Sequence, residues 1–103
     1  MKSFLKPVLG VLAAGLSAAT LAQTVTISVA SFPDLDRGIK LAIPLYKKLN
    51  PNVEIKLTSL AYADHHTAMT TALSTAVRLP DVMALESTYV GRFSQGGGLE
   101  DLS

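Results

Sequence analysis

Two seven-residue segments of this chain alternate between apolar and polar residues, except at their last position. In residues 24–30 (TVTISVA) and 53–59 (VEIKLTS) every second side chain is apolar or small, and Val, Ile and Thr are frequent. Successive side chains of a β-strand point to opposite faces, so this period of two predicts two strands, each with one buried face. The interval between them is long enough for a helical crossover, which lets the two strands lie parallel.

The interval between these segments predicts an amphipathic helix that starts near residues 35–37, with Asp34 or Asp36 as its N-cap. Pro44 should bend this helix, and Asn50-Pro51 should end it. Apolar side chains at spacings of three and four residues define one face of the helix. These are Ile39, Ile43, Tyr46 and Leu49.

The remaining chain repeats the succession of strand and helix. Asp64 is a candidate cap for a helix that closes at residues 78–80, residues 82–85 (VMAL) predict a short buried strand, and residues 89–95 predict a third helix ended by three glycines. The second helix should pack through Met69, Ala72, Leu73, Ala76 and Val77. Together the elements predict an α/β fold, a parallel βαβαβα sheet with helices on both faces.

Residues 1–22 have the three parts of an export signal. Lys2 and Lys6 give a positive start, an apolar stretch follows over residues 8–16, and small residues precede a cleavage site near Ala22, with Ala19 as the alternative. The apolar stretch falls short of the roughly 20 residues that span a bilayer. We therefore expect residues 23–103 to be the mature form, in the periplasm or outside the cell.

Composition excludes several classes of partner and site. Removing 22 of 103 residues leaves 81, enough for one small core, and changes the net charge from +1 to −1 because two lysines are lost. This charge favours neither nucleic acid nor an anionic membrane. The absence of cysteine excludes disulfides, thiolate metal ligands and a cysteine nucleophile.

In open parallel sheets, ligands bind outside the carboxyl ends of the strands. Those ends correspond here to residues 31–36, 60–64 and 86–89. Their aromatic rings could stack on a ligand and their acids could accept hydrogen bonds from it. The candidate ligand-binding residues are Phe32, Tyr62, Asp64, Glu86 and Tyr89. The alternatives are that Phe32 packs locally, that the acids near it cap a helix, and that Glu86 is a solvated loop residue.

The sequence predicts no catalytic residues, cofactor or metal. His65 and His66 are adjacent, so on a helix they point about 100° apart and cannot both bind one ion as residues four apart can. A general base or metal site near them remains an alternative interpretation. Neither a nucleophile elbow nor a catalytic pair of acids is present, and the triple glycine lacks the Lys of a phosphate-binding loop.

Three segments carry a resemblance to a known family. They are the Asn-Pro turn before the second strand (residues 49–53), Leu-Pro-Asp-Val (residues 79–82) and Gly-Gly-Leu-Glu-Asp-Leu (residues 97–102). Together they resemble the amino-terminal part of the extracellular solute-binding proteins of bacterial sugar ABC importers, the group that includes maltose-binding protein. The resemblance covers essentially all of residues 23–103.

The resemblance implies a periplasmic-binding-protein-like lobe, truncated here, in which the candidate residues would face a cleft closed by a second lobe. It also implies a monomer that binds a sugar or similar polar solute and delivers it to a membrane permease, without being an enzyme. The alternatives are a metal- or polyamine-type receptor, a fragment of a secreted hydrolase whose catalytic residues lie outside this chain, and a truncated remnant without function.

Overall fold

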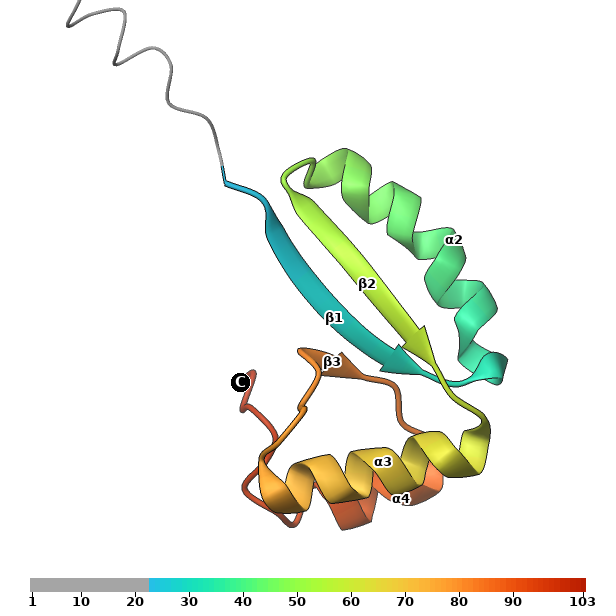
Figure 1. The fold of residues 1–103 in the computed structure, drawn as a ribbon, viewed down its shortest axis with the longest axis vertical. Helices are drawn as coiled ribbons and strands as arrows, with labels where there is room; N and C mark the ends of the chain where they lie inside the picture. Colours follow the sequence, from blue (N-terminus) through green and yellow to red (C-terminus); the bar gives the residue numbers. More distant parts are fainter. Residues whose placement is uncertain (1–22) are drawn as a thin grey trace, which may run out of the picture.

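The computed structural model describes residues 23–103, and the predicted export signal, residues 1–22, lies outside the described residues. Strands and helices alternate along the chain (Figure 1). The elements are β1 (Val25–Ser31), α2 (Pro33–Leu49), β2 (Val53–Ser59), α3 (Tyr62–Thr75), β3 (Val82–Met83) and α4 (Ser87–Phe93). None of the described helices is both long and apolar enough to cross a membrane.

The three strands form one parallel sheet in the order β2-β1-β3. β1 and β2 pair along their whole length, from Val25 opposite Val53 to Ser31 opposite Ser59. β3 is much shorter and pairs with β1 only through Val82 and Met83. This arrangement confirms the predicted α/β class and the parallel sheet, with β2 at the predicted residues.

The strand order places the helices on opposite faces of the sheet. The chain moves from β1 to β2 through α2, and then back across β1 to β3 through α3. Since such crossovers are right-handed, the change of direction puts α2 on one face and α3 on the other. Figure 1 shows α2 alongside β2, and α3 and α4 together in the other part of the molecule.

The hydrophobic core lies between the sheet and the α3–α4 pair. Ala30 of β1, Met69 of α3 and Phe93 of α4 are buried and belong to one cluster. Partly buried apolar residues surround this cluster: Ala68, Leu73, Met83, Leu85 and Tyr89. Ala30 thus contributes the central strand's side chain to this core.

Asp81 fixes the start of the short third strand to β1. Its carboxylate accepts hydrogen bonds from the backbone N–H of Ser28 (2.8 Å) and from the Ser28 hydroxyl (3.0 Å). The Ser28 hydroxyl in turn accepts a hydrogen bond from the backbone N–H of Asp81 (2.9 Å). The hydrogen bonds from Ser28 lower the pKa of the Asp81 carboxyl. These bonds extend the contact between β1 and β3 beyond two paired residues.

The predicted caps of the first helix are wrong. α2 begins at Pro33, with the extended residue Phe32 as its N-cap, and no side chain caps it. Proline is common at this first helical position because its fixed φ angle suits the helix. A backbone N–H there would have no partner within the helix, so its absence costs nothing. Asp34 and Asp36 therefore lie inside the first turn, where negative charge stabilises the helix dipole.

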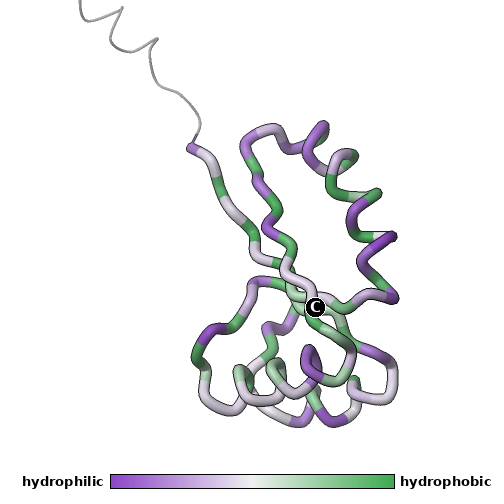
Figure 2. The backbone as a smooth tube through the Cα atoms, turned by 45° about the vertical axis from the view of Figure 1, so that its right-hand side comes forward, coloured by the Kyte–Doolittle hydropathy of each residue, from purple (hydrophilic) through white to green (hydrophobic). Residues whose placement is uncertain are grey.

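The predicted inner face of α2 is correct at Ile39 and Ile43, which are half-buried, and wrong at Tyr46 and Leu49. Tyr46 is 42% and Leu49 83% exposed. The less exposed positions run from Asp36 through the two isoleucines to Lys47, which forms an ion pair with Glu54 of β2, so the helix is rotated away from Leu49. Figure 2 shows apolar and polar residues alternating along this helix.

α3 and α4 also differ from expectation at their ends. Ala61, not Asp64, is the N-cap of α3, and α3 ends at Thr75 because Ala76 adopts a left-handed conformation with φ 55°. Ala76 and Val77, predicted to pack, thus lie beyond the helix and are exposed. α4 begins at Ser87, two residues earlier than predicted.

A glycine at the end of α3 should stabilise the chain. Ala76→Gly removes the Cβ that disfavours the left-handed conformation, so the free energy of unfolding should rise by about 1 kcal/mol. The matched control is Ala42→Gly in the exposed middle of α2, where the same change should lower it by about 0.5–1 kcal/mol. Urea denaturation measures both, and destabilisation by Ala76→Gly would show that Ala76 is not left-handed.

Candidate functional site

The candidate site lies where the connections of two neighbouring strands diverge. From the carboxyl end of β1 the chain continues into α2 on one face, and from β3 it continues into α4, which packs with α3 on the other face. Such a divergence in a parallel sheet opens a crevice at the carboxyl ends of the strands. Polar and aromatic residues that follow β1, β2 and β3 meet at this edge.

Tyr62 and Glu86 come from different connections and meet at this edge. Tyr62 is the first residue of α3, and its phenol O–H donates a long hydrogen bond of 3.4 Å to Oε2 of Glu86. Tyr62 remains 39% exposed. Partial burial raises the pKa of the Tyr62 phenol, and the negative charge of Glu86 raises it further.

Glu86 is not the solvated loop residue of the alternative interpretation, because its carboxylate caps α4. It accepts a hydrogen bond from the backbone N–H of Thr88 (2.9 Å) and further ones from the hydroxyls of Thr88 and Ser87. These hydrogen bonds, led by that of the Thr88 hydroxyl, lower the pKa of Glu86 to about 2. The group is thus a fixed anion beside a partly exposed phenol.

Tyr89 and Phe32 complete an aromatic cluster at the edge. The Tyr89 ring lies edge-on to Tyr62 with centroids 6.3 Å apart, and Phe32 lies edge-on to Tyr62 at 5.4 Å. Tyr89 is half-buried, whereas Phe32 is only 3% exposed. Phe32 therefore packs locally, the alternative stated for it, and supports the cluster from inside instead of presenting a ring face.

His65 and His66 lie beneath these residues and are each 1% exposed. Nε2 of His65 donates to the carbonyl oxygen of Ala84 at 2.7 Å, next to the carboxyl end of β3. Nδ1 of His66 lies 2.8 Å from the carbonyl oxygen of Tyr62, and the backbone N–H of Glu86 donates to its Nε2 at 3.2 Å. His65 thus bonds only the end of the β3 connection, whereas His66 links the start of α3 to Glu86.

Asp36 ties α2 to the end of β2. Ser59 donates a hydrogen bond of 2.5 Å to Oδ2 of Asp36, which is only 9% exposed. This bond lowers the pKa of the Asp36 carboxyl by more than burial raises it. Oδ1 is buried and accepts no hydrogen bond from the described residues, since the nearby Ser31 hydroxyl contacts the Phe32 carbonyl oxygen at 3.4 Å.

Asp64 stands apart from the other predicted site residues. It is exposed in the first turn of α3, and within residues 23–103 its carboxylate forms no hydrogen bond. The same described range contains no group of three His, Asp or Glu residues placed to hold a metal ion. The structure thus brings together Phe32, Tyr62, Glu86 and Tyr89, but not Asp64.

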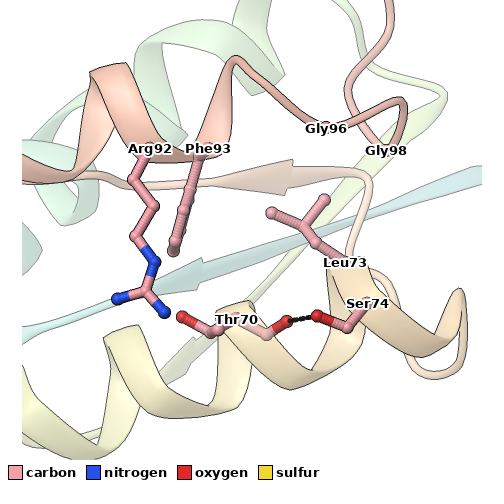
Figure 3. Close-up of a pocket in the computed structure, with 7 residues that line it drawn as sticks. All are labelled: Thr70, Leu73, Ser74, Arg92, Phe93, Gly96 and Gly98. Carbon is pink, nitrogen blue, oxygen red and sulfur yellow. Dashed lines mark hydrogen bonds between the residues drawn. The ribbon is translucent and has the colours of Figure 1, made fainter.

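A separate cavity of about 230 Å³ lies between α3 and α4. Figure 3 shows Arg92 and Phe93 extending from α4 toward Thr70 of α3, with Leu73 and Ser74 farther along that helix. Both hydroxyls already donate to backbone carbonyl oxygens one turn earlier, at 2.8 Å. The cavity differs from the edge of the sheet in its charge, because its lining includes the Arg92 guanidinium and no carboxylate.

The sequence motifs did not predict that both histidines are buried. His65 lies four and His66 three residues before Met69, which is buried on α3. Extending that period of three and four toward the start of α3 would have placed both imidazoles on the buried face. Buried polar side chains need hydrogen-bond partners, which would have directed attention to neighbouring carbonyl groups.

Comparison of the chain with family models, with curated proteins and with solved structures finds no match in any of the three. A functional assignment therefore depends on the geometry of the sheet edge and on the sequence pattern.

The dependence of stability on pH should show whether the Glu86 carboxylate stabilises the folded chain. Its pKa is lowered from the ordinary 4.5 to about 2, so it stabilises the folded chain above about pH 4.5, and this contribution is lost as the pH falls toward 2. Glu86→Gln should lower the Tm at pH 7 and flatten the fall of Tm between pH 4.5 and 2. Calorimetry across this range measures both; identical pH profiles would contradict the hydrogen bonds assigned to Glu86.

Proposed function

We propose that this chain is the start of the amino-terminal lobe of an extracytoplasmic solute-binding protein, which captures a carbohydrate or similar polar solute for an ABC importer. The observation that carries the proposal is the pairing of Tyr62 and Tyr89 with the ionised Glu86 at the divergence point of a parallel sheet. The resemblance of three sequence segments to this family supports it independently.

The chemistry of this edge suits a neutral polyol. Carbohydrates combine apolar ring faces with many hydroxyl donors, so aromatic rings and carboxylate acceptors recognise them together. Partly exposed Tyr62 and half-buried Tyr89 supply the rings, and Glu86 supplies an acceptor that stays charged at every ordinary pH. No proton transfer or bond cleavage is required of these groups.

In the family that the sequence resembles, a second lobe closes over the ligand. Residues 23–103 would then supply one wall of the cleft, with the permease contacted by the whole protein. We propose export to the periplasm or cell exterior, directed by residues 1–22, on the sequence pattern alone.

A ligand titration tests this proposal. In ¹⁵N-labelled full chain, one or more members of a panel of mono- and oligosaccharides should shift the amide signals of Tyr62, Glu86 and Tyr89. Tyr62→Ala should weaken the binding of that sugar roughly three- to tenfold, the range expected for loss of one stacked ring.

The matched control is Tyr46→Ala on α2, because Tyr46 is 42% exposed and Tyr62 39% exposed. This variant should bind the sugar like the unmodified chain. If no sugar shifts these amides, or if both variants bind equally, Tyr62, Glu86 and Tyr89 do not form a carbohydrate site in this chain.

A further inference from the structure

The hydrogen bonds of His66 determine its protonation. A backbone N–H can only donate, so Nε2 of His66, 3.2 Å from the Glu86 nitrogen, must be the acceptor. A carbonyl oxygen can only accept, so Nδ1, 2.8 Å from the Tyr62 oxygen, must carry the proton. Both bonds form together only in the neutral imidazole with its proton on Nδ1.

The same ring also contacts the aromatic residues of the edge. It stacks on Tyr89 with centroids 4.1 Å apart and planes inclined by 19°, and it lies 4.5 Å from the Tyr62 ring. Because His66 is 1% exposed, it offers no surface to a solute. It nevertheless contacts each of the three residues assigned to binding.

We propose that His66 is the positioning residue of the candidate site. Its ring holds Tyr62, Glu86 and Tyr89 in one arrangement through two hydrogen bonds and two ring contacts, although Tyr62 begins α3 whereas Glu86 and Tyr89 belong to the segment that follows β3. This inference rests on the proposed function for the role of the three residues. The arrangement of the groups around His66 can be measured without any ligand.

His65 provides a matched control on the same helix. It is equally buried and also forms one hydrogen bond to the loop after β3, through Nε2 to the Ala84 carbonyl oxygen. It does not bond Tyr62 or Glu86 among the described contacts. A change that merely disturbs the core should therefore have similar effects at His65 and His66, whereas loss of positioning should follow His66 alone.

The first test is the tautomer of His66 in the ¹⁵N-labelled full chain near neutral pH. Long-range ¹H–¹⁵N spectra should show a protonated Nδ1, a bare Nε2, and coupling between Nε2 and the Glu86 amide across their hydrogen bond. The alternative tautomer, or an imidazole that averages between forms, would overturn the proposal.

The second test separates the two hydrogen bonds. In His66→Asn the amide nitrogen can replace Nδ1 but nothing reaches the Glu86 N–H, so exchange of that amide should accelerate roughly tenfold, as expected for about 1.4 kcal/mol. In His66→Gln the side-chain oxygen can replace Nε2 as the acceptor, so the Glu86 amide should exchange more slowly than in His66→Asn. His65→Gln should leave it unchanged; equal acceleration in all three variants would reduce His66 to a core residue.

The third test uses the sugar identified by the titration of the unmodified chain. His66→Asn should weaken its binding at least threefold, while His65→Gln should not. Sugar binding unaffected by His66→Asn would overturn the positioning role. If no sugar binds the unmodified chain, the proposed function fails, yet the tautomer and exchange results still decide whether His66 holds the three residues together.

Discussion

The central position of β1 is the constraint on which the rest of the structure depends. β1 pairs with β2 along its full length on one edge and with β3 on the other, so all sheet hydrogen bonds of the described residues involve it. Because the chain leaves β1 toward one neighbour and then returns past it, the helices cover opposite faces. The candidate site results from this divergence, and residues from three connections meet there.

Buried polar groups join these connections to the sheet. Asp36 accepts from Ser59, His65 donates to Ala84, and His66 bonds both Tyr62 and Glu86. Burying such groups without partners is costly, so each bond favours the single arrangement in which the partners meet. The exposed residues of the edge are therefore positioned from beneath by side chains that do not themselves face solvent.

The sequence predicted well what depends on local pattern. The alternation in residues 24–30 and 53–59 identified β1 and β2, and Asn50-Pro51 identified the end of α2. Errors arose where a distant partner decides the outcome. The local pattern predicted Asp36 as a helix cap. Its actual hydrogen-bond partner, Ser59, lies 23 residues away, and no local rule reveals it.

The sequence predicted which residues gather at the candidate site, but not the contacts among them. The rule for parallel sheets placed Tyr62, Glu86 and Tyr89 at one edge, and the structure brings them together. The rule could not show that Phe32 turns inward, since this depends on rings from α3 packing over it. Nor could spacing alone show that Leu49 faces outward, because the rotation of α2 is set by its contact with β2.

The nuclear Overhauser spectrum of the full chain tests the arrangement of this sheet edge most directly. If the sheet order and the edge are as described, His66 ring protons show cross-peaks to both Tyr62 and Tyr89, alongside those between the paired residues Val29 and Leu57. Cross-peaks between Val29 and Leu57 without any from His66 to the two tyrosines would mean that β1 and β2 form but do not assemble the site.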